Sequence, residues 1–323
     1  MIITARGLSR TFHTRRGREK VDVAAVKGVD LDVADGEIVG FLGPNGAGKT
    51  TTLRMLTTLL SPTAGTATVA GHDLLADPVA VRRSIGYVSQ SGSTAGVARA
   101  GEEVVDHALL YGIPKSRATA RGQELFGQLE LEGMWARQPR TMSGGQKRRL
   151  DIVMGLIHDP RLVFLDEPTT GLDPQARANL WTHISALRSE LGTTVFLTTH
   201  YLDEADALCD RILVIDGGEI VASDTPEALK RQTAGDRVEL VVTDRGLVGA
   251  AAQHLQALDP DAEVAVDDRT VSVRVRSAGT RLAGLLRALD DAGIGLDAVE
   301  VRRPTLDDVF LTMTGRSLRD DAA

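Results

Sequence analysis

The sequence predicts an α/β protein in which a parallel core sheet is followed by a small α+β domain. A glycine-rich loop at residues 43–51 stands between an apolar run and a helical segment, which is the order strand, loop, helix. Two later apolar runs, at 161–168 and 194–200, are typical of parallel strands that are covered on both faces. The pattern changes again near residue 236, so the 323 residues are expected to form one large domain and one smaller one.

The bulk composition is that of an ordinary globular protein. The formal net charge is -7, so no general basic character points to nucleic acid, and no nucleic-acid partner is expected. The single cysteine, Cys209, excludes an internal disulfide framework and is typical of a reducing compartment. The N-terminus lacks the apolar core of a signal peptide, and no run of ~18 apolar residues occurs, so we expect no membrane span. Any membrane role would come through a partner.

The first 35 residues are expected to form short antiparallel strands. Apolar and charged residues alternate at 25–33, which is typical of a half-exposed sheet. A polar, arginine-rich stretch at 14–20 is predicted to be a turn. Phe12 stands just before this turn, and its ring could stack on an adenine base or pack within the small sheet. The residues alone leave both interpretations open.

The stretch GPNGAGKTT fits the phosphate-loop pattern G-x-x-x-x-G-K-[ST]. Glycines are needed because backbone N–H groups must wrap a phosphate closely, where a Cβ would block the approach. The helix that begins near Lys49 points its positive end at the same phosphates. We expect Lys49 to reach the β- and γ-phosphates and the hydroxyl of Thr50 to bind Mg²⁺. The expected nucleotide-binding residues are Gly43, Pro44, Asn45, Gly46, Ala47, Gly48, Lys49, Thr50 and Thr51.

The segment from 85 to 140 changes from a short strand to helices. Residues 85–90 are predicted to be a strand that ends at Gln90, whose amide could bind Mg²⁺ or be a plain surface group. Small and polar residues at 91–101 predict a mobile or irregular loop. Helical spacing occurs at 102–111 and again at 117–129.

A second helix start is predicted at Ser143, followed by Gly144, Gly145 and Gln146. Serine is a good N-cap, the two glycines allow close backbone approach, and helical residues follow through Ile157. This helix N-terminus is expected to bind an anion. The basic run at 147–149 directly behind it is interpreted as a solvated helix face.

Polar side chains follow the two apolar runs at the points where the strands end. Asp166 and Glu167 end the first run, and His200 ends the second. Ligands bind at the carboxyl ends of parallel strands, so these side chains are expected beside the phosphate loop. Asp166 could hold Mg²⁺ through water, and Glu167 could polarise the attacking water as a general base. His200 could hydrogen-bond a γ-phosphate and that water.

The C-terminal quarter shows a different order of elements. Strands are predicted at 238–242, 262–266, 270–275 and 296–301, and helices at 246–258 and 281–290. This β-α-β-β-α-β order predicts a small ferredoxin-like α+β domain. A last helix is predicted after Pro304.

Taken together and in order, the motifs resemble the nucleotide-binding subunit of ATP-binding-cassette (ABC) transporters. The motifs are the phosphate loop, Gln90, MSGGQ at 142–146, LVFLDE at 162–167, GLD at 171–173 and His200. The resemblance covers roughly residues 1–230. It implies the ABC type of P-loop NTPase domain, with a parallel core sheet, an antiparallel β subdomain and a helical subdomain.

The resemblance also implies roles for single residues. Lys49, Glu167 and His200 would be catalytic, with Glu167 as the catalytic glutamate and His200 as the switch histidine. The implied Mg²⁺ ligands are Thr50, Gln90 and Asp166. The stretch from Ser143 to Gln146 would bind the γ-phosphate of the ATP that the opposite subunit holds. Asp173 would make the inter-subunit contact of the D-loop, and Phe12 occupies the adenine-stacking position.

The implied assembly is a homodimer that closes over two ATP molecules and drives a separate polytopic membrane permease. The stretch PTLDDVFLTMTG at 304–315 resembles the tail of daunorubicin-resistance drug-export ATPases, which implies a permease of the ABC-2 type. The chain is then expected at the cytoplasmic face of the cell membrane and is expected to power efflux of drugs or other hydrophobic compounds. The expected domains are a nucleotide-binding domain at 1–232 and a dimerisation or regulatory domain at 236–323.

Two kinds of alternative remain open at this point. One is an importer or a lipid or polysaccharide exporter subunit. The other is a soluble ABC ATPase that acts on ribosomes or DNA. Members that act in translation carry two cassettes, and only one phosphate loop occurs here; repair members insert a long coiled coil, for which residues 51–142 are too few.

Overall fold

The computed structural model describes residues 1–16, 19–233, 235–258, 262–275 and 278–314. The chain divides into two compact units, Met1–Pro226 and Glu227–Ala323. Nearly all of helix α8 (Pro226–Thr233) therefore belongs to the second unit, whereas the sequence interpretation placed residues up to 232 in the first. None of the described helices is both long and apolar enough to cross a lipid bilayer.

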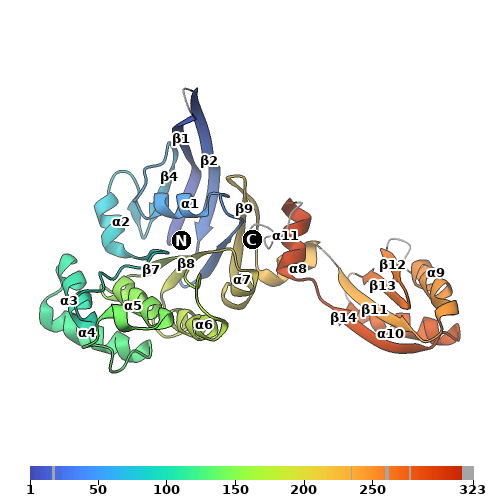
Figure 1. Ribbon diagram of the computed structural model, residues 1–323. Helices are drawn as coiled ribbons and strands as arrows, with labels where there is room; N and C mark the ends of the chain where they lie inside the picture. Colours follow the sequence, from blue (N-terminus) through green and yellow to red (C-terminus); the bar gives the residue numbers. More distant parts are fainter. Residues whose placement is uncertain (17–18, 234, 259–261, 276–277, 315–323) are drawn as a thin grey trace. The chain divides into compact units, whose positions relative to one another are not determined.

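The first unit is built on a mixed sheet of six strands in the described residues, five of them parallel (Figure 1). Its strands in spatial order are β10 (Glu219–Asp224), β9 (Arg211–Asp216), β3 (Ile38–Leu42), β8 (Thr194–Thr199), β7 (Leu162–Asp166) and β6 (Ile85–Val88). Strand β10 is the antiparallel edge strand. All residues of β3, β7 and β8 are buried, as expected for central parallel strands with both faces covered.

Helices cover both faces of this sheet (Figure 1). Helix α1 (Lys49–Leu56) lies on one face, between the parallel sheet and the antiparallel sheet described next. The opposite face carries α5 (Gly144–Leu156), α6 (Pro174–Ser189) and α7 (Leu202–Leu208). Inside the sheet, Phe196 of β8 packs between Phe41 and Phe164, with ring centroids 5.6 and 5.5 Å away. These rings fix the three central strands whose carboxyl ends carry the candidate site.

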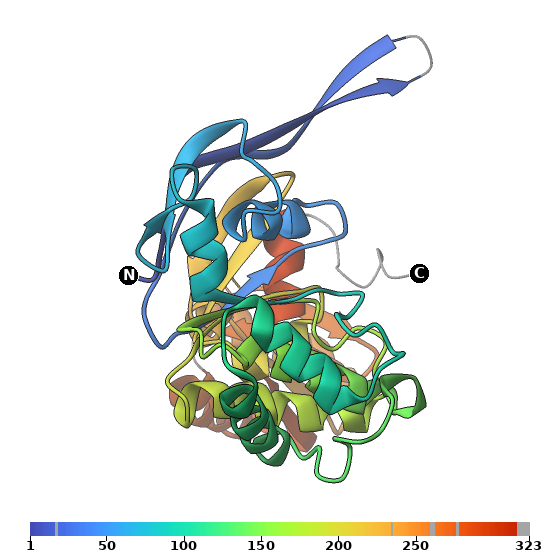
Figure 2. The ribbon, with the colours of Figure 1, turned by 90° about the vertical axis from the view of Figure 1, so that its left-hand side faces the viewer.

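The antiparallel sheet has the strand order β2-β1-β4-β5. Its strands are β1 (Ile3–Arg16), β2 (Glu19–Val33), β4 (Ala64–Val69) and β5 (His72–Asp73). The expectation of short strands and a turn at 14–20 is wrong for the described residues, because pairing continues to Thr14–Val21 and Arg16–Glu19. Residues 17 and 18 of that predicted turn lie outside the described residues. Backbone pairing can extend through polar residues when both strands stay extended, and the hairpin projects from the rest of the unit (Figure 2).

A helical region follows β6 and precedes β7. It contains α3 (Ala100–Leu110), α4 (Lys115–Gln128) and the turn η1 (Pro139–Thr141), and α2 (Pro78–Ser84) lies just before β6. The Trp135 ring occupies the space beside two helical glycines: a Cβ on Gly101 would lie 2.2 Å from the ring, and one on Gly122 would lie 2.8 Å from it. The two glycines therefore leave the space in which the Trp135 ring packs against α3 and α4. The helices expected near 102–111 and 117–129 are present and begin slightly earlier than predicted.

The second unit contains the expected β-α-β-β-α-β order. Its elements are β11 (Asp236–Val242), η2 (Arg245–Leu247), α9 (Val248–Leu258), β12 (Val264–Asp267), β13 (Thr270–Val275), α10 (Ala278–Asp291), β14 (Leu296–Arg302) and α11 (Leu306–Thr314). The antiparallel sheet has the order β12-β13-β11-β14. Its core includes Val238, Leu240 and Val273 from the strands and Leu255 and Leu289 from α9 and α10. The ferredoxin-like arrangement predicted from the sequence is confirmed.

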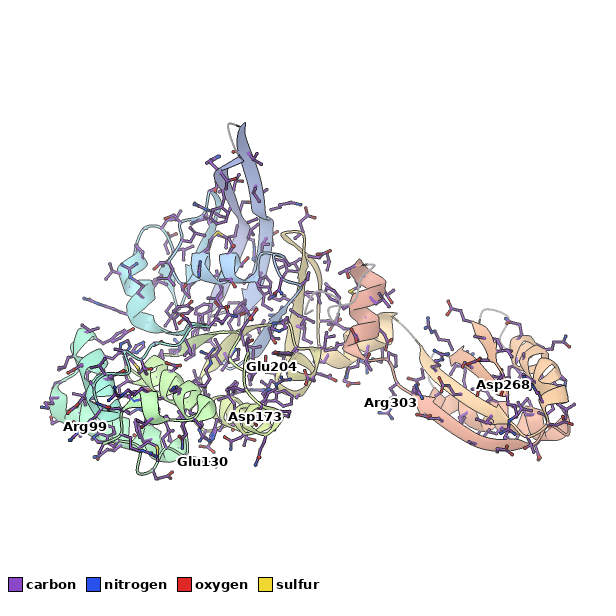
Figure 3. All side chains as sticks on the ribbon, in the orientation of Figure 1. Arg99, Glu130, Asp173, Glu204, Asp268 and Arg303 are labelled. Carbon is purple, nitrogen blue, oxygen red and sulfur yellow. The ribbon has the colours of Figure 1, made fainter. Side chains whose placement is uncertain are left out.

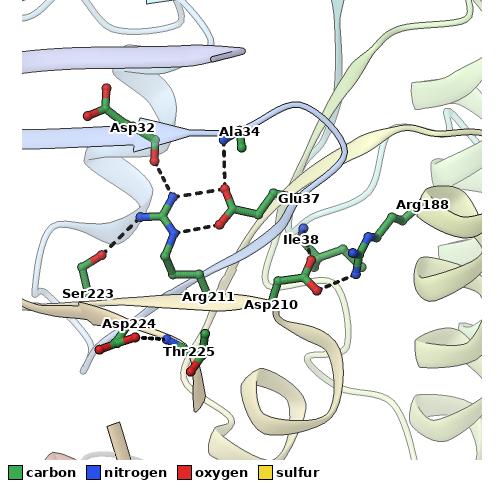
Figure 4. Close-up of polar contacts among 10 residues, drawn as sticks. All are labelled: Asp32, Ala34, Glu37, Ile38, Arg188, Asp210, Arg211, Ser223, Asp224 and Thr225. Atoms are coloured by element: carbon green, nitrogen blue, oxygen red, sulfur yellow. Dashed lines mark hydrogen bonds and ion pairs between the residues drawn. The ribbon is translucent and has the colours of Figure 1, made fainter. Parts of the chain in front are cut away.

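The amino-terminal ends of the parallel strands are joined by a network around Arg211 (Figure 4). Its guanidinium donates to both carboxylate oxygens of Glu37, at 2.7 and 3.1 Å, and to the carbonyl of Asp32 at 2.5 Å. Beside it, Asp210 accepts from the Ile38 N–H at 2.8 Å and from Arg188 at 2.5 Å. These contacts connect β9, β3 and the end of β2 at the edge opposite the candidate site.

Candidate active site

The phosphate loop connects β3 to α1, and its glycines are required by close backbone contacts. A Cβ on Gly43 would lie 2.3 Å from the carbonyl oxygen of Ile215, and one on Gly48 would lie 2.7 Å from that of Ala25. Gly48 has φ +110° and Gly46 has φ +80°, conformations that favour glycine. Any larger residue at these positions would shift the loop. Gly43 and Gly48 are thus required by the packing of this chain's own backbone, and their role in wrapping a phosphate stays a prediction.

Lys49 is the first residue of α1, and its ammonium group is buried within the loop. Its Nζ donates to the carbonyl oxygens of Gly43 at 2.6 Å and Pro44 at 3.0 Å. Burial lowers the pKa of Lys49, and the carboxylates of Glu167 and Asp166 oppose that shift. The positive charge is thus held at the loop by its own backbone and by the two acidic groups. Thr50 and Thr51 follow in the first turn of α1, both half-buried.

Asp166 ends β7 and is 2% exposed. Its Oδ1 accepts a hydrogen bond from the Thr198 hydroxyl on the neighbouring strand β8, at 2.7 Å. The N–H of Glu167 donates to the carbonyl oxygen of Thr198 at 3.1 Å and to its Oγ1 at 3.0 Å. Thr198 therefore holds both acidic residues at the strand ends. The sequence interpretation missed this threonine, because a threonine inside an apolar run is also an ordinary strand residue.

Side chains from the carboxyl ends of β6, β7 and β8 come together at the Glu167 carboxylate. Its Oε2 accepts from Nε2 of Gln90 at 2.9 Å and from the Thr170 hydroxyl at 3.2 Å. Nδ1 of His200 lies 3.5 Å from its Oε1. The His200 ring is the largest influence and lowers the pKa of Glu167, against the opposing effect of burial. The site thus holds a carboxylate that is ionised at neutral pH beside an amide, a hydroxyl and an imidazole.

Helix α5 begins as the sequence predicted. Oγ of Ser143 accepts from the Gln146 N–H at 3.2 Å, and Oε1 of Gln146 accepts from the Ser143 N–H at 3.0 Å. This capping box holds the first turn, while the Ser143 and Gly144 positions are exposed. Asp173, which lies just before α6 (Figure 3), accepts from the Ala176 N–H at 2.9 Å and is the N-cap of that helix.

The loop after Gln90 is irregular, as expected, but its backbone is tied to two buried carboxylates. Asp151 on α5 accepts from the Ser93 N–H at 2.7 Å. Glu103 on α3 accepts from the N–H groups of Ala95 and Gly96 at 3.0 and 2.9 Å. Small residues allow the chain to turn toward these acceptors, so the composition that predicted irregularity also permits an ordered set of contacts.

Phe12 lies half-buried on β1, opposite Val23 of β2. The Arg10 guanidinium lies over its ring, 4.9 Å from the centroid. Ala25, whose carbonyl faces Gly48 of the phosphate loop, is two residues along β2 from Val23, which is about 7 Å along a strand. Phe12 therefore packs on the hairpin, whose strand β2 contacts the phosphate loop at Ala25, and stacking of its ring on adenine stays a prediction.

The basic run at 147–149 does not form the solvated helix face that the sequence suggested. Arg148 is 7% exposed, and its guanidinium donates to backbone carbonyls at the strand ends. The Arg149 side chain is 14% exposed and contacts Glu130 and Asn179. Local sequence could not show this, because the acceptors of Arg148 lie 18 to 59 residues away along the chain.

A phosphate loop with a buried lysine, together with two acidic residues at the carboxyl end of the parallel strand β7, defines a P-loop NTPase. Residues 26–170 match the family described as "ABC transporter". Residues 225–314 match the family described as "ATP-binding protein DrrA1-3-like, C-terminal domain". The two matches fall on the two units of the structure.

Relatives match over nearly the whole chain. The daunorubicin resistance ATP-binding protein DrrA3 of Streptomyces coeruleorubidus is 44% identical over 316 residues, which cover 97% of this chain and 98% of that protein. The doxorubicin resistance ATP-binding protein DrrA of Mycobacterium tuberculosis is 38% identical over 317 residues, covering 97% and 94%. The Nod factor export ATP-binding protein I of Cupriavidus metallidurans is 37% identical over 302 residues, covering 93% and 95%.

The chain therefore belongs to the ABC transporter ATP-binding proteins of the daunorubicin-resistance type. A solved dimeric ATP-binding cassette in a post-hydrolysis state, bound to ADP and Pi, is 27% identical with a TM-score of 0.62, over 69% of this chain and 98% of that one. The family and fold class predicted from the motifs are confirmed. The protein binds ATP and is an ATPase.

Proposed function

We propose that this protein is the ATP-hydrolysing subunit of an exporter that moves drugs or antibiotics through a separate membrane permease. The support for drug export is the agreement among relatives named for daunorubicin and doxorubicin resistance, which match both units of the chain. The support for the catalytic role is the Glu167 carboxylate, placed between Gln90 and His200. This placement is the single observation on which the site assignment depends.

Glu167 is the general base in this proposal. Its lowered pKa keeps the carboxylate ready to accept a proton from a water molecule as the water oxygen attacks the γ-phosphorus of ATP. The bond from that phosphorus to the β-phosphate oxygen breaks, giving ADP and phosphate. Lys49 and the loop N–H groups balance the charge on the phosphates, and His200 orients the water and the γ-phosphate.

The side chains of Thr50, Gln90 and Asp166 are suited to Mg²⁺, because all three offer hard oxygen atoms. Asp166 is buried and oriented by Thr198, which suits a fixed ligand. The described residues contain no cluster of three or more His, Cys, Asp or Glu side chains for a metal. In sites of this class Mg²⁺ is held by one or two carboxylates together with the substrate phosphates, and it neutralises their charge.

The proposed assembly is a homodimer in which the signature segment of each copy, Ser143 to Gln146, faces the ATP held by the other copy. The exposed Ser143 and Gly144 at the capped start of α5 are suited to meet a phosphate from outside the subunit. Asp173 lies in the loop expected to meet the second copy, and Phe12 would stack on adenine. The dimeric cassette with ADP and Pi is a structural precedent for such an arrangement.

The membrane partner is proposed to be a polytopic permease of the ABC-2 type, which would place the chain at the cytoplasmic face of the membrane. The test is an affinity pull-down of the tagged chain from its native membranes, followed by mass spectrometry. We expect a stoichiometric polytopic partner, and cells lacking this chain should accumulate more of a drug such as daunorubicin. A dimer without a membrane partner, or one bound to ribosomes or DNA, would contradict the proposal.

Export of a different compound class is the second candidate, because a relative named for Nod factor export also matches both units. The same pull-down distinguishes the two, since the permease sequence and the compounds that accumulate without it report the cargo. The second unit is proposed to serve dimer contact or regulation. Deleting residues 236–323 should then change dimerisation, ATPase activity or transport, and unchanged values for all three would rule this role out.

A further inference from the structure

Arg148 is a buried arginine whose role the mechanism above does not include. It lies in the first turns of α5, two residues after Gln146 of the signature segment, and is 7% exposed. Its guanidinium donates from three nitrogens to three backbone carbonyls: Nη1 to Ser89 at 2.6 Å, Nε to Pro168 at 2.7 Å and Nη2 to Asp166 at 2.9 Å. A buried charge with this many directed contacts fixes the segments it touches.

The three acceptors surround the catalytic groups in the sequence. Asp166 directly precedes Glu167, Pro168 directly follows it, and Ser89 directly precedes Gln90. The same guanidinium therefore holds the backbone on both sides of Glu167 and at the base of the side chain that donates to Glu167. Helix α5, strand β7 and strand β6 meet at this one group.

The backbone at Glu167 requires such support. Its φ is +45°, in the left-handed region that a glutamate rarely adopts. A conformation of this kind persists only when the surrounding structure holds it in place. Arg148 supplies two of those restraints from one side of the chain, and Thr198 supplies the hydrogen bonds to the Glu167 N–H.

Asp151, one turn further along α5, extends the same connection. Its Oδ2 lies 4.0 Å from Nη1 of Arg148, and its Oδ1 accepts from the Ser93 N–H. Helix α5 is thus bonded to the chain before Gln90 through Ser89 and after it through Ser93. A shift of the helix that carries the signature segment must move Gln90 and Glu167, or break these bonds.

We propose that Arg148 is a positioning residue for ATP hydrolysis, which couples the signature helix α5 to the backbone conformation of Glu167 and to the placement of Gln90. Arginine is required because its planar group presents separate N–H donors to all three carbonyls at once. A lysine ammonium at the end of a flexible chain cannot span them. The inference rests on the proposed role of Glu167 as the general base.

The test compares Arg148→Lys with Arg149→Lys in the full chain. The two arginines are neighbours on α5 and are both mostly buried, but Arg149 contacts Glu130 in the turn after α4 and Asn179 on α6, not the strand ends. Steady-state phosphate release gives kcat and KM for ATP, and thermal unfolding gives Tm for each variant. We expect Arg148→Lys to lower kcat about 10–100-fold, because a small misplacement of a catalytic group has an effect of this size. Its KM for ATP should change less than about two-fold, and Arg149→Lys should lower Tm with kcat nearly unchanged.

An Arg148→Lys protein that folds and keeps the wild-type kcat, or that loses no more kcat than Arg149→Lys, would overturn the proposal. If Arg148→Lys does not fold, the same measurements on Asp151→Asn decide, since asparagine retains an acceptor for Ser93 and removes the charge opposite Arg148. A fall in kcat at constant KM supports the coupling, and a wild-type kcat overturns it. Glu167→Gln is measured in parallel: if that variant hydrolyses ATP at the wild-type rate, the assignment of the base fails, whatever Arg148→Lys shows.

Discussion

The two ends of the parallel sheet are each held by an arginine, but in different ways. At the amino-terminal ends, Arg211 forms a bidentate pair with Glu37, with N···O distances of 2.7 and 3.1 Å. At the carboxyl ends, Arg148 donates to three carbonyl oxygens, and its ion pair with Asp151 is 4.0 Å long. The bond to Glu37 raises the pKa of Arg211, whereas burial lowers the pKa of Arg148.

This difference separates a stabilising end of the sheet from a reactive one. A bidentate arginine occupies lone pairs of a carboxylate that a Mg²⁺ ion or the proton of a water would otherwise use. By bonding to carbonyls, Arg148 fixes the backbone while the carboxylates of Asp166 and Glu167 remain directed toward Lys49, Thr198 and Gln90. Substitutions at the carboxyl ends should therefore change turnover, and those at the amino-terminal ends should change stability.

The largest expected effect is that of Glu167→Gln at the carboxyl ends. The amide keeps the shape of the side chain but cannot accept the proton, so ATPase activity should fall by about 10²–10⁴-fold. Phosphate release measures the loss, and ATP binding by equilibrium dialysis should remain near the wild-type value. Activity within a few-fold of wild type would show that this carboxylate takes no part in the chemistry and that the two ends of the sheet do not differ in this way.

Arg211→Gln is the corresponding change at the amino-terminal ends. It removes the bidentate pair and leaves the Glu37 side chain, which is 15% exposed, without its arginine. We expect a loss of about 2–3 kcal/mol in the free energy of unfolding, as for hydrogen bonds to charged groups. Urea unfolding measures this, and Arg82→Gln, which loses one exposed hydrogen bond to Thr58, is the control. A wild-type unfolding midpoint, or a fall in kcat of the folded protein, would contradict the assignment of this end to stability.

Strand β8 offers a matched pair within one element. Thr198 at its carboxyl end donates to Asp166, and Thr194 at its amino-terminal end accepts from the Gly36 N–H at 2.8 Å. Both are almost fully buried. Valine at either position should cost about 1–3 kcal/mol of stability, because a buried polar partner is left unpaired. Only Thr198→Val should also lower kcat, by about ten-fold for a lost bond of roughly 1.4 kcal/mol. Equal kcat values for the two variants would show that the ends do not differ in this way.

The smallest expected effect is the acid dependence of stability at the amino-terminal ends. Burial raises the pKa of Glu37, but the bonds from Arg211 and the Ala34 N–H outweigh it, and the net pKa is lowered. A lowered carboxyl pKa stabilises the fold above the unfolded value of about 4.3, and this stability is lost as pH falls through the folded pKa. From about pH 5 downward, as pH falls through the folded pKa of Glu37, Tm should therefore fall more steeply for wild type than for Glu37→Gln. If Tm changes with pH by the same amount in the two proteins, the pair of Glu37 and Arg211 does not contribute to the loss of stability in acid.

Sequence alone predicted the elements whose signals are local. The phosphate loop, the capped start at Ser143 and the apolar runs that end at Asp166 and His200 are each defined within about ten residues. The ferredoxin-like order of the second unit followed from alternation and length in the same way. Parallel-strand ends meet at one edge of a sheet, so the gathering of Gln90, Glu167 and His200 was also open to prediction.

What could not be predicted depends on partners that are distant in the chain. Arg148 had the appearance of a surface cation because its neighbours in sequence are basic, and its acceptors come from two other strand ends. The length of the β1–β2 hairpin was underestimated because polar residues near its tip pair through backbone atoms, which composition does not report. Thr198 shares its residue type with ordinary strand positions, so only the neighbouring strand shows its function.

The loop that follows Gln90 has a consequence for the speed and selectivity of association. Its N–H groups at Ser93, Ala95 and Gly96 are already bonded to Asp151 and Glu103, while Val97 at its far side is 77% exposed. A molecule that meets this loop encounters a shape that exists before contact, so little conformational entropy remains to be lost on docking. The rate of association would be limited by the orientation of the two molecules and not by ordering of the loop. A surface that does not match the shape of the loop would bind only weakly.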